Sequence, residues 1–195
     1  MRFAIVSALV LFPLVANAQH APHRHGAPYS GLEGREIKSL SNEDQADLRR
    51  GAGWGLALPA ELNGHPGPSH VLELKAELAL SEQQIEAVSQ IFERMRQDAI
   101  AEGERFIAAE KAVEALFRER SLDENTLRRA IGASEASRAR LRMIHLLAHL
   151  STPALLTAAQ IARYKQLRGY ISDPCAAVPA GHDRSMWRRH NGCGG

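Results

Sequence analysis

Two histidines, His145 and His149, stand four positions apart in a segment rich in helix-forming residues. On an α-helix this spacing places both imidazoles on one face, one turn apart, where they can bind the same metal ion. His70 and Glu73 can add a nitrogen and an oxygen ligand if their segment folds back against the end of that helix. The pattern predicts a metal site formed by these four residues. In the alternative interpretation, the two imidazoles lie at the helix edge and interact with the last carbonyl groups before Pro153.

A second group of histidines lies near the start of the chain, in residues 19–31. This segment is rich in Pro and Gly and too poor in apolar residues to offset the entropy of ordering, so we predict a disordered arm. Its histidines are His20, His23 and His25. Such arms can bind metal ions weakly, although a plain linker is the simpler interpretation.

Residues 171–195 form a Pro- and Gly-rich tail that holds both cysteines of the chain, Cys175 and Cys193, together with His182 and His190. In an oxidising compartment two cysteines at this separation are expected to pair. We therefore predict a disulfide that closes a short loop in the tail.

The strongest periodic signal begins at Ser81 and extends to about Arg118. Apolar residues recur there in alternating steps of three and four, interrupted at Glu102: Ile85, Val88, Phe92, Met95, Ala99, Phe106, Ala109, Val113 and Leu116. This is a heptad pattern over five repeats. The helix would be roughly 55 Å long at about 1.5 Å per residue. It needs a partner for its apolar face, because isolated helices are only marginally stable.

Residues 123–150 supply that partner. They carry a second, weaker stripe formed by Leu127, Ile131, Ser134, Leu141, Ile144 and Ala148. A short link at residues 120–122 makes the two helices antiparallel neighbours.

Shorter helices flank the predicted hairpin. Capping residues and short amphipathic patterns place them at residues 42–50, 69–78 and 157–169. The predicted fold class is therefore all-α: a long antiparallel helical hairpin with short flanking helices in residues 32–170, between disordered ends.

No pattern typical of an enzyme occurs in the sequence. A nucleophile elbow, a phosphate loop and a paired Cys-x-x-Cys are absent, and Leu146 stands where the helix of zinc proteases has glutamate. A two-helix hairpin also offers little of the concave volume that encloses a substrate. We therefore do not expect an enzyme, and no cofactor is required.

Residues 1–18 are typical of a cleavable secretory signal peptide. Arg2 gives the positive start, residues 3–15 are apolar, and Ala16-Asn17-Ala18 fits a cleavage site. The apolar run is shorter than the roughly 20 residues that cross a bilayer, and no longer run follows. We predict no membrane span in the mature chain; the alternative is an uncleaved signal that acts as an anchor.

Charge is nearly balanced along the chain. Of the 24 lysines and arginines, Arg2 leaves with the signal, so 23 basic residues face 22 acidic ones. This balance gives no reason to expect a nucleic-acid partner or an acidic membrane partner through net charge.

Two predicted helix starts have nearly the same sequence, Leu80-Ser81-Glu82-Gln83-Gln84-Ile85 and Leu156-Thr157-Ala158-Ala159-Gln160-Ile161. In each, the hydroxyl group caps the helix and the glutamine closes a capping box, while the leucine and isoleucine form a hydrophobic staple. These local interactions explain the motif without a further function. The motif residues are Leu80, Ser81 and Gln84 at the first start and Leu156, Thr157 and Gln160 at the second.

Two such starts around a helical hairpin, behind a signal peptide, resemble the LTxxQ family of periplasmic proteins. This family includes the Spy and CpxP chaperones, ZraP and the heavy-metal sensor CnrX. The resemblance covers about residues 29–170, and Ser81 replaces the threonine of the first motif. It implies a periplasmic, four-helix hairpin protein that forms a homodimer. It also implies an ATP-independent chaperone for unfolded or misfolded envelope proteins, a modulator of stress signalling, or a metal sensor.

The resemblance to CnrX bears on the metal prediction. That sensor binds its metal through histidines, a glutamate and a methionine, including a His-x-x-x-Met pair, whereas here His149 follows His145. A site without the thioether ligand suits a zinc, nickel or cobalt ion better than copper(I). A sensor also needs a membrane signalling partner, and the sequence contains no anchor. The chaperone is therefore the favoured prediction and the heavy-metal sensor the alternative.

A chaperone of this type needs exposed apolar side chains that hold unfolded chains loosely. We expect Met95, Phe106 and Met143 to be exposed in this way. Arginines flank them in the sequence, namely Arg94, Arg105, Arg138 and Arg142. In the alternative interpretation, these arginines are solvated helix faces with partly buried stems.

Overall fold

The computed structural model describes residues 28–119, 122–171, 178–191 and 193. The chain divides into two units, Met1–Glu33 and Gly34–Gly195. All helices of the described residues belong to the second unit, and no strand occurs among these residues. The predicted all-α fold is confirmed. The predicted signal peptide and residues 19–27 of the predicted arm lie outside the described residues.

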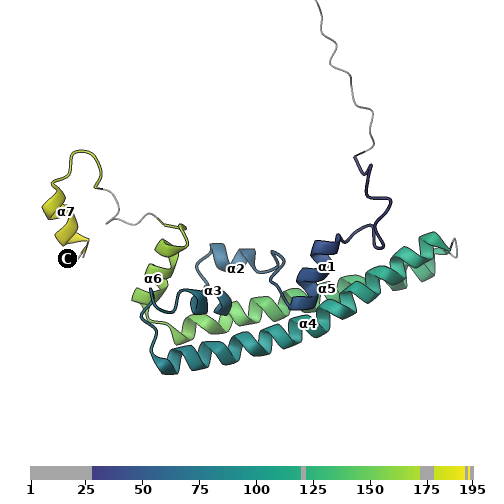
Figure 1. Ribbon diagram of the computed structural model, residues 1–195, viewed down its shortest axis with the longest axis horizontal. Coiled ribbons are helices and arrows are strands. Elements are labelled where there is room, and N and C mark those ends of the chain that lie inside the picture. Colours follow the sequence, from purple (N-terminus) through teal and green to yellow (C-terminus); the bar gives the residue numbers. More distant parts are fainter. Residues whose placement is uncertain (1–27, 120–121, 172–177, 192, 194–195) are drawn as a thin grey trace, which may run out of the picture. The chain divides into compact units, whose positions relative to one another are not determined.

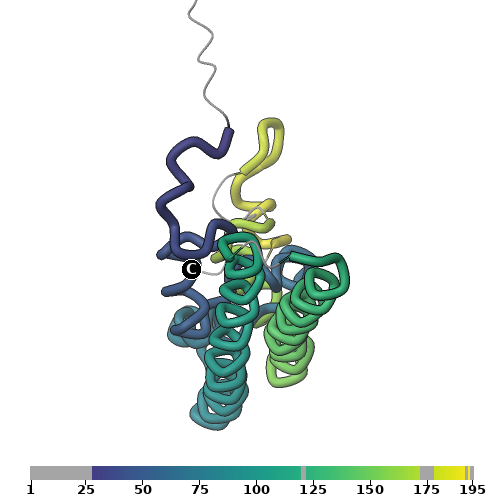
Figure 2. The backbone as a smooth tube through the Cα atoms, turned by 90° about the vertical axis from the view of Figure 1, so that its right-hand side faces the viewer, coloured from purple at the N-terminus to yellow at the C-terminus, as the bar shows by residue number. Residues whose placement is uncertain are grey.

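Two long helices, α4 (Glu82–Arg118) and α5 (Glu124–Ser151), form the predicted antiparallel hairpin (Figure 1). Seen along the hairpin, they run side by side over most of their length (Figure 2). Ser81 and Asp123 cap their N-termini through side-chain oxygens, as polar N-cap residues commonly do. The heptad pattern therefore predicted both the length and the pairing of these helices correctly.

Glu102, which interrupts the heptad pattern, is buried between the two helices, and only 3 % of the residue is exposed. It accepts hydrogen bonds from Ser137 Oγ at 2.5 Å, Arg105 Nη1 at 2.6 Å and Arg140 Nε at 2.9 Å. Burial alone would raise the pKa of Glu102, but these donors outweigh it and hold the pKa below its ordinary value. A charged residue is tolerated in the seam because three donors satisfy it.

Five further α-helices and one short 3₁₀ helix complete the described part of the chain. They are α1 (Asn42–Arg50), α2 (Leu58–Leu62), α3 (Pro68–Glu73), the 3₁₀ helix η1 (Thr152–Leu155), α6 (Ala158–Leu167) and α7 (Arg184–His190). The helix predicted at 42–50 is confirmed. The one predicted at 69–78 is shorter and continues as turns, while α2 and α7 were not predicted.

The short helices α1, α2, α3 and α6 lie along one side of the hairpin (Figure 1). α1 approaches α4 so closely that a Cβ atom at Gly103 would lie 2.5 Å from the backbone oxygen of Leu48. Only glycine permits this approach, because any side chain there would meet a backbone atom that cannot move away.

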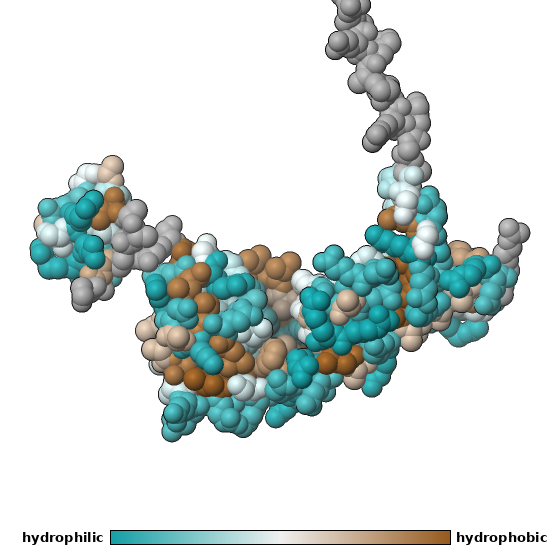
Figure 3. Space-filling model, in the orientation of Figure 1, coloured by the Kyte–Doolittle hydropathy of each residue, from teal (hydrophilic) through white to brown (hydrophobic). Residues whose placement is uncertain are grey.

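Two apolar clusters hold these elements together. The first joins α1 and the segments before and after it to the middle of the hairpin and contains Ile37, Leu40, Leu48, Leu56, Ala99, Phe106, Ile107 and Leu141. The second lies at the open end of the hairpin and contains Val71, Leu78, Val88 and Tyr164 from α3, the following turns, α4 and α6. Hydrophobic surface gathers over this end of the hairpin in Figure 3. Among the described residues, no helix has the length and apolarity needed to cross a membrane.

Candidate functional site

The paired motif forms the two predicted capping boxes. Ser81 Oγ accepts from the backbone N–H of Gln84 at 3.2 Å, and Gln84 Oε1 accepts from the backbone N–H of Ser81 at 3.0 Å. Thr157 and Gln160 repeat this arrangement at 3.2 and 2.9 Å. Both capping boxes thus form as the sequence predicts.

The two boxes also join each other, which the sequence did not predict. Gln84 Nε2 donates to Gln160 Oε1 at 2.9 Å, and Gln160 Nε2 donates to Gln84 Oε1 at 3.0 Å. Each amide also donates to a backbone oxygen beside the other helix start, that of Leu155 at 2.8 Å and that of Leu78 at 3.2 Å. The motif therefore connects the starts of α4 and α6 and fixes the open end of the hairpin. Leu80 and Leu156 pack against the second apolar cluster there.

The two predicted metal-binding histidines of α5 are buried, His145 at 2 % and His149 at 9 % exposed. The alternative interpretation, in which both imidazoles lie at the helix edge, does not hold for His149, because the segment between α2 and α3 lies directly on it. His149 Nδ1 lies 2.7 Å from the backbone oxygen of His65, and a Cβ atom at Gly67 would lie 2.5 Å from His149 Nε2. Glycine at position 67 is what allows the segment to lie directly on the imidazole.

His145 lies one turn earlier and has a different environment. Its Nε2 atom is buried and has no hydrogen-bond partner. Burial, with a smaller contribution from neighbouring His149, lowers the pKa of His145 to about 4. The imidazole is therefore neutral at physiological pH, which is also the form that binds metal ions.

The other two predicted ligands, His70 and Glu73, pair with each other on α3. His70 Nδ1 lies 2.9 Å from Glu73 Oε2 at a solvent-exposed position. Within the described ranges, no three or more His, Cys, Asp or Glu residues are grouped so that they could hold one metal ion. The structure thus does not bring the four predicted ligands together, although His70 and His149 line the same hollow of about 300 Å³. Binding of a zinc, nickel or cobalt ion stays a prediction.

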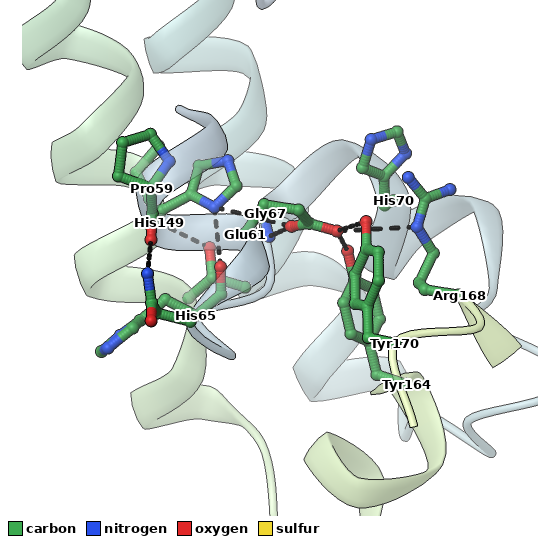
Figure 4. A network of polar contacts seen from close by, with 12 residues as sticks. Pro59, Glu61, His65, Gly67, His70, His149, Tyr164, Arg168 and Tyr170 are labelled. Carbon is green, nitrogen blue, oxygen red and sulfur yellow. Dashed lines mark hydrogen bonds and ion pairs between the residues drawn. The ribbon is translucent and has the colours of Figure 1, made fainter. Parts of the chain in front are cut away.

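The acidic group at this hollow is Glu61 of α2, which sequence analysis missed. Its Oε1 accepts from the hydroxyl groups of Tyr164 and, at 2.9 Å, Tyr170, and it lies 3.5 Å from Arg168 Nε (Figure 4). Its Oε2 accepts from the backbone N–H of Gly67 at 3.4 Å. Burial, followed by the contact with Glu61, raises the pKa of the Tyr164 hydroxyl. Because the tyrosines stand 103 and 109 positions from Glu61 in the chain, no local spacing predicts this network.

An exposed apolar stripe lies on α5, formed by Met143, Leu147 and Leu150. These residues are 56, 51 and 66 % exposed, and their steps of four and three place them on one helix face. With Ala60 and His65 they border a shallow apolar hollow of about 280 Å³. We call these three residues the α5 apolar stripe.

Two leucines of α2, Leu58 and Leu62, are also exposed and belong to the helix that packs against α5. Arg138 and Arg142 border a neighbouring hollow that Leu58 also lines. Met143 is exposed, as expected. The prediction that Met95 and Phe106 are exposed is wrong. Both are buried, since the heptad seam of α4 takes them into the hairpin.

In the tail, Cys193 is disulfide-bonded. Cys175, its predicted partner and the other cysteine of the chain, lies outside the described residues. The described part of the tail therefore contains no free thiol.

Comparisons with known proteins identify no relative: no family model, no curated protein and no solved structure matches this chain. The resemblance to the LTxxQ family thus depends on the paired motif and its setting.

Proposed function

We propose that this chain is a periplasmic, ATP-independent chaperone of the Spy/CpxP type, which binds unfolded or misfolded envelope proteins and acts as a homodimer. The observation that carries the proposal is the α5 apolar stripe. Monomeric soluble proteins rarely keep a contiguous apolar patch at the surface unless it binds something.

The surroundings of the stripe suit a loosely held, unfolded chain. Leu58 and Leu62 add exposed apolar side chains on α2, which packs against α5, and the hollow beside the stripe is shallow rather than enclosed. Arg138 and Arg142 add positive charge nearby, so that both apolar and acidic parts of a client can make contact. A surface without a deep pocket can bind many sequences weakly.

Suppression of aggregation tests this function. The purified protein, without ATP, is expected to keep a chemically denatured client soluble at a near-stoichiometric ratio. The double variant Leu147→Gln, Leu150→Gln removes much of the apolar contact area. About fivefold more of it is expected to be needed for half-maximal suppression.

A matched control carries the same chemical change elsewhere on the hairpin. Phe117 and Ile131 are 57 and 44 % exposed and lie outside the α5 apolar stripe. The variant Phe117→Gln, Ile131→Gln is expected to suppress aggregation like the unmodified protein. Equal loss in both variants, or no suppression by the unmodified protein, would contradict the proposal.

The second candidate function is a heavy-metal sensor, and the buried, unpartnered Nε2 atom of His145 favours it. A neutral imidazole one turn from His149 can act as a nitrogen ligand, although protein zinc sites use three or four protein ligands.

Calorimetric titration of the chelator-treated protein with zinc and nickel ions tests this alternative. If the histidine pair binds the metal, the variant His145→Ala, His149→Ala is expected to lose the binding, whereas His70→Ala, Glu73→Ala is expected to keep it. Unchanged stoichiometry in the first variant removes the pair from the site. Circular dichroism of each variant verifies that the helices are still formed.

A further inference from the structure

The segment from residue 178 onward carries a local excess of positive charge. It holds three arginines, Arg184, Arg188 and Arg189, and a single acidic residue, Asp183. Its formal net charge of +2 equals that of the whole chain. The near balance of the complete sequence therefore conceals a basic segment, and its residues Arg184–His190 form α7.

α7 is amphipathic. At 100° per residue, Arg184, Arg188 and Arg189 cover one side of the helix, while Met186 and Trp187 lie on the other, with His190 between them. Met186 is 64 % exposed, and the Trp187 ring is half-buried against the ring of His182, with a centroid distance of 4.8 Å. All three arginines are exposed.

Several contacts hold this short helix in shape. The carboxylate of Asp183 accepts from the backbone N–H of Met186 at 2.8 Å and caps the N-terminus. At the other end, the backbone N–H of Cys193 donates to the oxygen of Arg188 at 2.8 Å, and Asn191 donates to that of Trp187. Cys193 is also held by its disulfide bond. The basic and apolar sides are thus presented by a formed helix, which lowers the entropy cost of binding.

From this arrangement we infer that α7 binds the surface of a bilayer that contains anionic lipids. The arginines match the negative headgroups, and Met186 and the edge of Trp187 match the boundary between headgroups and acyl chains, where tryptophan is enriched in proteins. An arginine near an anionic membrane surface contributes about a fivefold increase in binding. Three arginines and one or two apolar side chains give weak, reversible binding, which would tether the protein close to a membrane.

Cosedimentation of the full purified protein with vesicles tests this inference. Vesicles of phosphatidylcholine with about 30 % phosphatidylglycerol are expected to bind the protein, whereas pure phosphatidylcholine vesicles are expected to bind it much less. Raising the salt concentration to about 0.5 M is expected to release it, because salt screens charges at the surface. The variant Arg184→Gln, Arg188→Gln, Arg189→Gln is expected to bind the anionic vesicles about a hundredfold more weakly.

A control with the same change in net charge separates a local site from general electrostatic attraction. Arg50, Arg128 and Arg129 are exposed on α1 and α5, and their replacement by glutamine is expected to change binding only slightly. Met186→Ser is expected to weaken binding by a smaller factor than loss of the three arginines. Equal losses in the two triple variants, or equal binding to both kinds of vesicle, would overturn the inference.

Two further measurements distinguish membrane binding by α7 from client binding by α5 and from nucleic-acid binding. The variant Leu147→Gln, Leu150→Gln is expected to bind anionic vesicles normally, so failure of the proposed chaperone function and failure of this inference are distinguishable. If the protein instead binds a DNA duplex, loses that binding in the α7 variant and ignores anionic vesicles, α7 recognises nucleic acid and the inference is wrong.

Discussion

Replacement of Glu61 by alanine is expected to lower the free energy of unfolding by about 3 kcal/mol. The change removes the acceptor for two tyrosine hydroxyls, one of them on the fully buried Tyr164, and the partner of Arg168. A buried donor without an acceptor loses the water that would solvate it in the unfolded chain. Because these contacts connect α2 with α6 and the turn after it, the variant should also loosen the packing of α6. Urea denaturation at neutral pH measures the loss.

Two variants show whether the effect comes from the network. Glu73 is an exposed glutamate on α3 whose partners are His70 and Ser69, one turn away on the same helix, and Glu73→Ala is expected to cost less than about 1 kcal/mol. Tyr164→Phe removes one donor but leaves Tyr170 and Arg168 on the carboxylate, so an intermediate loss of about 1–2 kcal/mol is expected. If Glu61→Ala costs no more than Glu73→Ala, the network does not stabilise the fold.

The parts of the fold that sequence analysis predicted correctly all have a local signal. The heptad pattern of residues 81–118 repeats often enough to identify a long helix and its buried side. Ser41, Ser81 and Thr157 cap helices through contacts with residues three positions away, so their role can be inferred from adjacent sequence. α2 has only five residues and too little periodicity to be recognised, and α7 lies in a tail whose Pro and Gly content suggested disorder.

The candidate sites were predictable only in part, because they depend on contacts between distant segments. His145 and His149 were identified from their spacing, but the contacts that bury His149 come from residues 65–67, about 80 positions away in the chain. Glu61 likewise meets Tyr164 and Tyr170 across more than 100 positions of the chain. Met95 and Phe106 belong to the heptad stripe of α4, so the pattern itself indicates their burial, whereas Met143 stands beside the stripe of α5 and faces solvent.

Acid is expected to destabilise the protein specifically through His145. The pKa of this imidazole is lowered from 6.5 to about 4 in the folded chain, so between these values the unfolded chain binds more protons than the folded one. The contribution of this group to stability is therefore fully present above pH 6.5 and is lost as the pH falls from 6.5 to about 4. Protonation of this single group in the unfolded chain lowers the free energy of unfolding by about 2 kcal/mol at pH 5 and by about 3 kcal/mol at pH 4.

The variant His145→Leu isolates this contribution. At pH 7.5 it is expected to be at least as stable as the unmodified protein, because it removes a buried Nε2 atom that has no partner. Between pH 7 and pH 5 it should lose about 2 kcal/mol less, when both are measured by urea denaturation in the presence of a metal chelator. His182→Gln changes an exposed histidine and should follow the unmodified protein. Parallel pH profiles for His145→Leu and the unmodified protein would show that the buried imidazole does not make this fold acid-sensitive.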